Sequence, residues 1–290
     1  MLQSIRRLAA AATDRFLDRA APTLQNIRRT QELYRDHIAR CTAYPTRAAS
    51  SPAAASIVES VRSRGYHVVP GYWDRQKCAA AVREVDRIVR QYPRFVLGPP
   101  KSDLRLFGAD NLSALIAEFG NDPLLVEVAS LHNRMPTRLG MTLAARLPAA
   151  PDNLGSGDGW HRDQFFVSTK SMLYLTDVGA DNGPFQMIDR STAVDDVCRD
   201  IKDARLEHLQ YRIRDEQVAK LVELQPARLL TFAASAGTLL IFNASSIHRG
   251  KPIASGERYA LTNYYFTAEW SDEEIFRHFP PIATAHVRAD

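Results

Sequence analysis

The pattern of apolar and polar positions divides the chain into a helical N-terminal part and a β-rich remainder. From residue 2 to residue 40, apolar side chains recur every three or four positions, which is the period of an amphipathic helix. Pro22 falls inside this stretch, and because proline has no N–H to donate, we expect it to end a first helical segment. Residues 42–56 are rich in Pro, Ser and Ala, lack periodicity, and are expected to form a linker.

The next hundred residues mix short apolar runs with helical periodicity. Tyr66–Val69 is predicted to be a strand, and a helix is predicted from about Asp74, a residue type suited to N-capping. A second helix is expected over residues 111–119. A third helix should then precede a strand near residues 141–147.

From Trp160 onward the pattern becomes that of a sheet. Strands are predicted over residues 165–167, 171–176, 185–188, 237–247 and 258–266, with a charged helical insertion over 195–224. These elements favour an α+β fold with a mainly β core: a double-stranded β-helix, that is, a cupin-like jelly roll flanked by N-terminal helices. We expect residues 1–56 to form a helical extension and linker, and residues 57–290 the jelly-roll domain.

Charge and cysteine content narrow the class of protein. The chain has 290 residues, and 37 Lys and Arg against 33 Asp and Glu give a net charge of +4, too mild for a nucleic-acid-binding surface. Its three cysteines lie far apart in sequence, which argues against a disulfide scaffold and favours the cytoplasm. No apolar run approaches the roughly 18 residues that a membrane span needs.

The N-terminal helix allows two interpretations. Its arginines are typical of a helix that lies on an anionic membrane surface, which would make the protein peripheral to a membrane. Asp14 and Asp18 dilute that basic face and favour a solvated helix that packs one side on the protein body. Long N-terminal helices also serve contacts between subunits, so a homo-oligomer is compatible with this segment.

Four residues carry the candidate chemistry. His161 and Asp163 lie two positions apart, which on a strand places them on one face. His248 closes the apolar run 238–247, and Arg258 follows ten residues later, where a hairpin would return it beside His248. Two histidines and one carboxylate form a facial triad that holds ferrous iron and leaves three positions open. A guanidinium in the same barrel binds a carboxylate bidentately, so the set fits 2-oxoglutarate, with dioxygen as co-substrate.

The same segments resemble the phytanoyl-CoA dioxygenase-like family of Fe(II)/2-oxoglutarate-dependent oxygenases. Beyond WHRD, the resemblance rests on GYHVVPGYWDRQKC, LYLTDVGADNGPFQMI and GTLLIFNASSIHRGKPIASGERYALTNYYF, and spans roughly residues 60–270. It implies that His161, Asp163 and His248 are the iron ligands, and that Arg258 pairs with the distal carboxylate of 2-oxoglutarate. Halogenating members of the family lack the carboxylate ligand, so Asp163 favours hydroxylation.

Several other residues have a functional and a structural interpretation. Lys170 and Tyr174 lie on the same face of a predicted strand and are candidates for binding the oxo-acid. The structural alternative is that Lys170 lies at a strand edge and Tyr174 packs in the core. Thr262 shares the strand parity of Arg258 and either supports the same carboxylate or packs in the core. Arg146 precedes the segment of the candidate ligands and could reach the C1 carboxylate of the oxo-acid, but we expect it at the surface. Trp160 and Phe165 flank the candidate ligands, and they either wall off the oxidant or pack in the core.

Together these observations predict an Fe(II)/2-oxoglutarate-dependent dioxygenase. It would hydroxylate an unactivated C–H bond of a small or lipid-linked organic substrate and release succinate and CO₂, and the basic excess would suit an acidic substrate. Two alternatives remain at this stage. One is a jelly-roll metal-binding or glycan/lipid-binding protein without oxygenase activity. The other is a zinc or manganese enzyme with the same three ligands, because ligand identity does not fix the metal.

Overall fold

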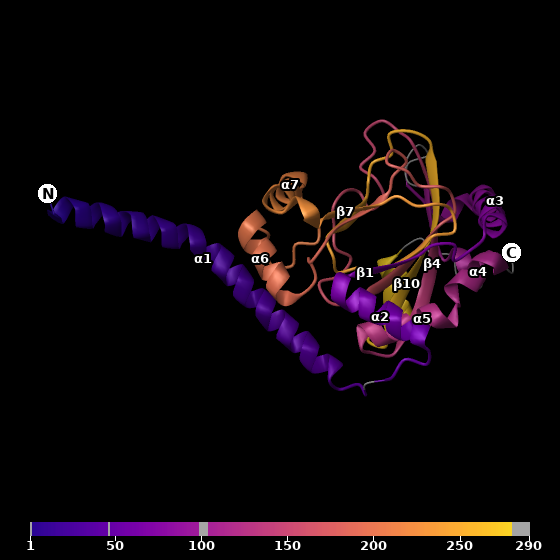
Figure 1. Cartoon of the computed structure of the whole chain (residues 1–290), viewed down its shortest axis with the longest axis horizontal. Helices are drawn as coiled ribbons and strands as arrows, with labels where there is room; N and C mark the ends of the chain where they lie inside the picture. The colour runs from indigo at the N-terminus through magenta and orange to yellow at the C-terminus, as the bar shows by residue number, and fades with distance from the viewer. Residues whose placement is uncertain (1, 46, 99–103, 280–290) are drawn as a thin grey trace.

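Two antiparallel sheets face each other in the body of the protein. The computed structural model describes residues 2–45, 47–98 and 104–279, with side chains from residue 21 onward. Residues 280–290 of the predicted jelly-roll domain lie outside the described residues. Within the described part, one sheet has the strand order β1-β8-β5-β10-β4-β3-β2 and the other β7-β6-β9. In Figure 1 the long strands β4 and β10 lie on one side of the body and β7 on the other. This arrangement matches the predicted jelly roll with helices added to it.

The strands and helices have the following bounds. The larger sheet contains β1 (Tyr66–Val69), β2 (Val96–Leu97), β3 (Leu104–Phe107), β4 (Thr137–Pro148), β5 (Thr169–Tyr174), β8 (Leu239–Asn243) and β10 (Glu257–Thr267). The smaller sheet contains β6 (Phe185–Ile188), β7 (Leu229–Phe232) and β9 (His248–Gly250). The α-helices are α1 (Leu2–Cys41), α2 (Pro52–Arg64), α3 (Arg75–Gln91), α4 (Ala114–Gly120), α5 (Pro123–Asn133), α6 (Val194–Ala204), α7 (Asp215–Leu224) and α8 (Asp272–His278). Short 3-10 helices cover Pro93–Phe95, Ala109–Asn111 and Pro226–Arg228.

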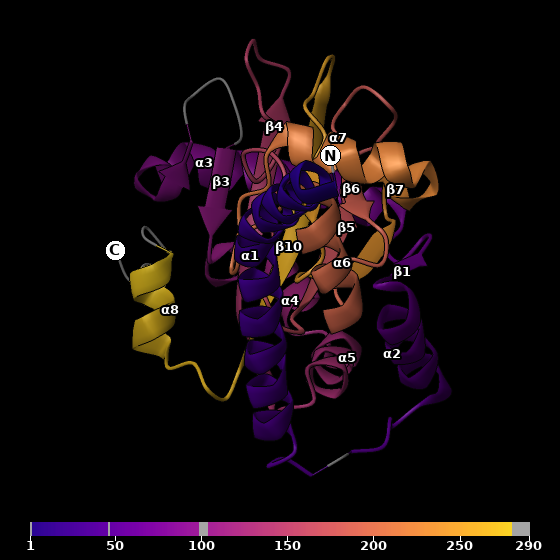
Figure 2. The same cartoon turned by 90° about the vertical axis from the view of Figure 1, so that its left-hand side faces the viewer.

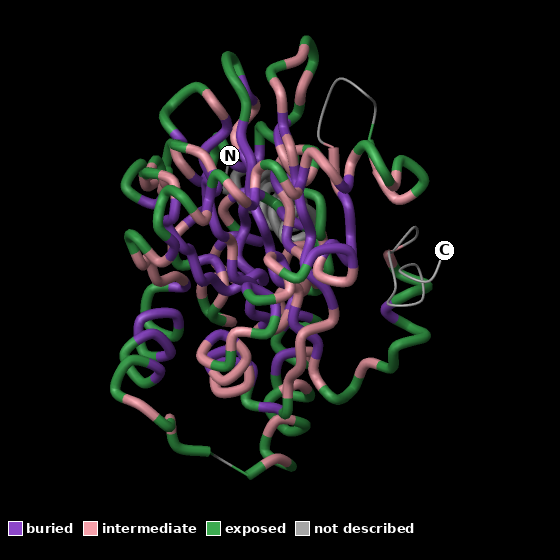
Figure 3. Tube along the Cα trace, turned by 90° about the vertical axis from the view of Figure 1, so that its right-hand side faces the viewer, coloured by how far each residue is buried: buried purple, intermediate pink, exposed green. Residues whose placement is uncertain are grey.

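The larger sheet is buried on both faces. Its outer side chains, such as Leu173, Ile241 and Leu261, join one apolar cluster with the inner sides of helices α2 to α5. Its inner side chains, such as Leu240 and Phe242, pack toward Met187 of the smaller sheet. Figure 3 shows the buried segments gathered in the middle of the molecule. Because both faces are covered, β8 is apolar at almost every position, without the alternation of a half-exposed strand.

Side-chain caps fix where several of these helices begin. Asp74 accepts a hydrogen bond from Lys77 N at 2.7 Å, so the helix predicted from about Asp74 is confirmed as α3. Ser51 caps α2 by accepting from Ala54 N at 3.1 Å. Helix α2 therefore begins inside the stretch that was expected to be a linker, which shortens the non-helical connection at its C-terminal end. The division into an extension and a jelly-roll domain stays a prediction.

Helix α1 continues through Pro22, so the expectation of two separate helical segments is wrong. A proline removes one hydrogen bond and bends a helix, and packing on a neighbour can hold the turns on either side. Figure 1 shows α1 changing direction about midway along its length, and Figure 2 shows its later half beside α6. There the hydroxyl of Tyr34 is buried and donates to Thr192 O at 3.1 Å.

Packing of α1 on the body is therefore confirmed for residues 21–41. The basic face of residues 2–20 lies outside the described side chains, so contact with a membrane remains a prediction. Among the residues that the structure describes, no helix is both long enough and apolar enough to cross a bilayer.

Three further sequence expectations need correction. Residues 165–167 are irregular, because Phe165 packs into an apolar cluster beneath α6 rather than joining a sheet. The run 237–247 is not one strand: β8 ends at Asn243, a turn follows, and His248 opens β9 in the other sheet. The charged insertion contains two helices, α6 and α7, with an irregular connection between them. The strands β2, β3 and β7 and helix α8 were not expected.

Candidate active site

Backbone pairing brings the two candidate histidines together. His161 N donates to His248 O at 2.9 Å, and His248 N donates to His161 O at 2.9 Å, an isolated antiparallel bridge. Asp163 N donates to Ala244 O at 3.0 Å, in the turn between β8 and β9. The prediction that His161 and Asp163 lie on a regular strand is therefore wrong. The segment that carries them is held against the turn and strand that carry His248.

The three side chains converge on one point. His161 Nε2 lies 3.8 Å from Asp163 Oδ1, and His248 Nε2 lies 3.3 Å from Asp163 Oδ2. One ligand atom from each residue can be chosen so that all lie within 4.8 Å of one another. Two imidazole nitrogens and a carboxylate at this spacing can hold a divalent first-row metal.

Backbone carbonyls set the orientation of both imidazole rings. His161 Nδ1 lies 2.9 Å from Gly159 O, and His248 Nδ1 lies 2.9 Å from Ser246 O. A carbonyl oxygen can only accept, so each Nδ1 must carry the proton. The lone pair of each Nε2 then faces the carboxylate, which is the arrangement found for metal-binding histidines.

Burial and charge favour the protonation states that a metal requires. Burial, with a smaller effect from His248, lowers the pKa of His161 to about 3, so the ring is neutral at neutral pH. Burial opposes ionisation of Asp163, but Lys170 and His248 outweigh it and hold the pKa of the carboxyl well below its usual value. The site therefore offers a neutral His161 ring and an ionised Asp163 carboxylate, which are the forms that bind a metal.

Lys170 lies beside the triad. Its Nζ is 2.8 Å from Asp163 Oδ2 and 3.7 Å from the centroid of the Tyr264 ring. Only 7% of the residue is exposed. Lys170 belongs to β5 and pairs in register with Tyr264 of β10. It lines the cavity beside Asp163 and does not lie at a strand edge, which was its other interpretation.

Arg258 is buried in the same interior but reaches it by a different route from the one predicted. Its strand, β10, pairs with β4 and β5, whereas β9 pairs with β6. The expected hairpin between the strands of His248 and Arg258 is therefore wrong, since the two residues belong to opposite sheets. A Cβ placed on Gly250 would lie 3.2 Å from Arg258 Nη2, so the guanidinium reaches β9 across the barrel. Another of its nitrogens, Nη1, donates to Gly183 O.

Tyr174 and Thr262 also face the interior. The hydroxyl of Tyr174 donates to Phe232 O at 3.1 Å and accepts from Phe185 N at 2.9 Å, so its proton is already used. Thr262 is buried on the face of β10 that carries Arg258, opposite Met172.

The residues with two interpretations are now placed. Arg146 is partly exposed and pairs with Glu257 at 3.1 Å and Asp86 at 3.4 Å, which confirms the surface expectation. Trp160 and Phe165 pack with Ile188 and Val197 in an apolar cluster, so the core interpretation fits both.

A cavity of about 410 Å³ opens onto Asp163 and Lys170. Several of its walls come from parts of the chain that sequence reasoning did not assign to a site. They include aromatic side chains after the last strand and in α8, and the connection between α6 and α7: Tyr211, Arg212, Trp270, His278 and Phe279. The sequence carries no local signal for these walls, because tertiary packing alone brings them to the triad.

The jelly roll and the His-Asp-His cluster define a class of metal-dependent oxygenase, and comparison of the sequence with family models identifies the family. The family model described as phytanoyl-CoA dioxygenase (PhyH) matches residues 61–260. The chain belongs to this family and is an enzyme that uses iron and 2-oxoglutarate. Among curated protein sequences, none matches this chain.

Solved structures show the same fold. EctD from S. alaskensis with 2-oxoglutarate and 5-hydroxyectoine aligns with a TM-score of 0.59 at 16% identity, over 77% of this chain and 79% of that one. The α-ketoglutarate-dependent epimerase SnoN from nogalamycin biosynthesis gives 0.54 at 18% identity, over 74% and 83%. HygX from Streptomyces hygroscopicus with nickel and 2-oxoglutarate gives 0.52 at 15% identity, over 77% and 90%. At these identities the likeness extends to the fold alone.

Proposed function

We propose that this enzyme hydroxylates an unactivated C–H bond of a small organic substrate, with release of succinate and CO₂. The observation that carries the proposal is the convergence of His161 Nε2, His248 Nε2 and the Asp163 carboxylate beside a cavity that His161 and Asp163 line. Asp163 also supports hydroxylation over halogenation, because halogenating relatives of this family lack a carboxylate at this position.

In this proposal the triad holds Fe(II). When bound there with 2-oxoglutarate, the iron would activate dioxygen for oxidative decarboxylation of the oxo-acid and for attack on the substrate. The protein holds the two imidazoles in one tautomer through Gly159 O and Ser246 O. Fixed rings keep both nitrogens directed at the metal and leave the remaining coordination positions free for the oxo-acid and dioxygen.

Arg258 and Lys170 are proposed to bind 2-oxoglutarate. Arg258 presents a buried guanidinium, whose fork matches the two oxygens of the distal carboxylate. Lys170 supplies a second cation next to Asp163, at the metal end of the site. Thr262 lies between their register positions on β10 and is proposed to donate its hydroxyl to the same oxo-acid. Because the proton of Tyr174 is used by Phe232 O, we assign Tyr174 the role of shaping the interior near Arg258.

The cavity walls indicate the class of substrate. Tyr264, Phe266 and Trp270 give an apolar, aromatic surface, and Arg212 supplies positive charge. A volume of about 410 Å³ suits a small molecule. A substrate with an apolar body and an acidic group matches these walls, whether it is free or linked to a lipid.

Conversion of 2-oxoglutarate to succinate tests the proposal. The wild-type protein with Fe(II), 2-oxoglutarate and dioxygen should form succinate slowly without substrate, and His161→Ala or Asp163→Ala should reduce this at least a hundredfold. Circular dichroism should show that both variants keep the wild-type fold. Succinate formation at the wild-type rate in folded variants would contradict the assignment. Once a substrate is found, incorporation of one atom of labelled dioxygen into the product separates hydroxylation from ring formation or desaturation.

A further inference from the structure

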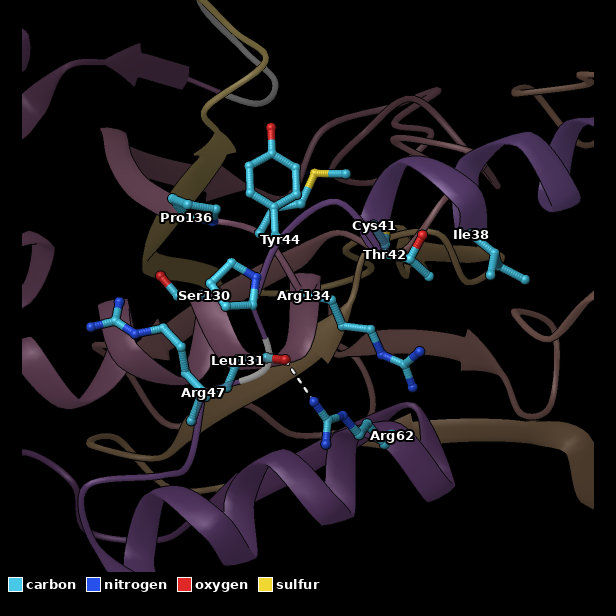
Figure 4. Close-up of a pocket in the computed structure, with 12 residues that line it drawn as sticks. Ile38, Cys41, Thr42, Tyr44, Arg47, Arg62, Ser130, Leu131, Arg134 and Pro136 are labelled. Atoms are coloured by element: carbon cyan, nitrogen blue, oxygen red, sulfur yellow. Dashed lines mark hydrogen bonds between the residues drawn. The ribbon is translucent and has the colours of Figure 1, made fainter.

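A second pocket, of about 470 Å³, lies apart from the candidate active site. It is formed by the end of α1 and the segment after it, by α2, and by the end of α5 with the residues that follow, and it has no lining residue in common with the active-site cavity. Figure 4 shows it from close range. Its volume falls within the range of about 300–1,000 Å³ that is usual for small-molecule sites.

Three arginines line the pocket, and two of them form its cationic end. Arg62 comes from the last turn of α2, and Arg134 is the C-cap residue of α5. In Figure 4 the two guanidinium groups lie on the same side of the pocket, with Arg47 on the other side. Burial, and then the charge of Arg134, lower the pKa of Arg62, which shows that the two cations repel each other. Among the described residues neither one forms an ion pair with a carboxylate within 4.0 Å.

Helix capping explains only part of this arrangement. Arg62 Nη2 donates to Leu131 O at 2.7 Å and so satisfies a carbonyl near the end of α5. Arg134 has no comparable partner among the described hydrogen bonds. It occupies a left-handed backbone conformation, with φ of 56°, where glycine is the usual residue. Both arginines are exposed, and together they form a cationic end of the pocket. Two guanidinium groups on one side of a pocket can hold a single anion through charge-assisted hydrogen bonds.

The other walls are apolar or carry hydroxyl groups. Tyr44, Met135 and Pro136 form an apolar side, and Thr42 and Ser130 contribute hydroxyl groups. The pocket therefore combines a cationic end with an apolar surface. An inorganic ion would leave most of its volume unfilled.

We propose that this pocket binds an organic phosphate monoester. Its phosphate would lie between Arg62 and Arg134, and its apolar body would contact Tyr44 and Met135. A phosphate monoester carries a charge of about −1.5 to −2 at pH 7, which matches two guanidinium groups better than the single charge of a carboxylate. The phosphate can belong to a soluble metabolite or to the headgroup of a phosphatidic-acid lipid.

Isothermal titration calorimetry with phenyl phosphate tests the site in the full-length protein. We expect saturable binding of one molecule per chain, weakened at least tenfold in Arg134→Gln and in Arg62→Gln. Arg64→Gln is the matched control. It removes the same charge from the same helix, but Arg64 bonds Ser60 Oγ at 2.8 Å and does not line the pocket. Absence of saturable binding, or equal affinity in wild type and Arg134→Gln, would overturn the proposal.

Three further arms of the experiment define the ligand. Inorganic phosphate should bind at least fivefold more weakly than phenyl phosphate, and equal affinity would refute a role for the apolar body. Saturating 2-oxoglutarate should leave phenyl phosphate binding unchanged, whereas displacement would place the ligand in the active site and refute the second pocket. Sedimentation with phosphatidic-acid vesicles identifies a lipid source if Arg134→Gln binds less than Arg64→Gln. Equal sedimentation of the two variants, with soluble binding intact, identifies a soluble ester.

Discussion

The ammonium group of Lys170 lies 2.8 Å from Asp163 Oδ2, inside the barrel. Burial alone would neutralise either group, and each keeps its charge because the other is present. The carboxylate that is proposed to bind iron is therefore compensated by a cation from β5. The same ammonium is also available to the oxo-acid.

Replacement of Lys170 tests whether it binds 2-oxoglutarate in addition to compensating the charge of Asp163. We expect Lys170→Met to raise the KM for 2-oxoglutarate about tenfold or more, because it removes one charge-assisted hydrogen bond worth roughly 1.5–3 kcal/mol. Initial rates of succinate formation at varied 2-oxoglutarate measure this effect. Lys77→Met serves as the control, because Lys77 is a partly exposed lysine of α3 that pairs with Glu118 and does not line the active-site cavity. An unchanged KM would show that Lys170 only neutralises Asp163.

Substitutions of Arg258 test whether 2-oxoglutarate binding needs only its positive charge or also the planar shape of its guanidinium. Arg258→Lys keeps the charge but loses the planar fork, so we expect the KM for 2-oxoglutarate to rise about ten- to a hundredfold, and more in Arg258→Gln. Arg146→Gln is the matched control, since Arg146 lies on the neighbouring strand and pairs with Glu257 and Asp86 outside the barrel. A KM that changes equally in Arg258→Gln and Arg146→Gln would refute the assignment.

Gly157 leaves room for the ring of His161. A Cβ at residue 157 would lie 2.1 Å from His161 Cε1, whereas one at Gly159 would meet no atom within 4 Å. Both glycines have positive φ, 86° and 89°, so alanine strains the backbone similarly at each. We therefore expect Gly157→Ala to weaken Fe(II) binding at least tenfold and Gly159→Ala to have little effect. Metal titration of both variants measures this difference, and equal affinities would show that the ring moves aside without consequence.

His132 should make the protein sensitive to acid. It is buried, its Nδ1 lies 2.8 Å from Thr169 Oγ1, and burial lowers its pKa to about 3 from the ordinary 6.5. Below about pH 6.5 the unfolded chain binds a proton that the native state does not. The free energy of unfolding therefore falls as the pH drops toward 3, by up to about 1.4 kcal/mol per pH unit from this residue.

A variant isolates the contribution of His132. Urea unfolding of wild type and His132→Gln between pH 7 and pH 4.5 should show a smaller loss of stability in the variant, whatever its stability at pH 7. The pKa of His161 is also lowered by burial, but its effect on the pH dependence of stability is the same in both proteins and cancels when they are compared. Parallel pH dependences would contradict a buried neutral His132.

The sequence predicted the chemistry of the site better than its geometry. His161, Asp163 and His248 could be predicted to lie together because metal ligation restricts residue types. Arg258 could be proposed beside them because a guanidinium suits a carboxylate. The expected hairpin was wrong because the apolar run before His248 contains a turn, Ala244 to Ser246, that moves the chain to the other sheet.

Other features depended on contacts that no local pattern encodes. Phe165 has strand propensity, yet it lies in an irregular segment because it fills the cluster beneath α6. Pro22 does not end α1, whose later turns are held by packing on α6. Arg212 and Trp270 reach the cavity from the insertion and from the segment before α8, whose positions follow from the folded chain alone.

The most direct test of the central claim is the visible spectrum of the protein under anaerobic conditions with one equivalent of Fe(II) and excess 2-oxoglutarate. If His161, Asp163 and His248 hold the iron while the oxo-acid chelates it, the wild type should develop a weak metal-to-ligand charge-transfer band, and folded His248→Ala should not. Tight zinc binding without this band in the wild type, or the same band in His248→Ala, would contradict the account.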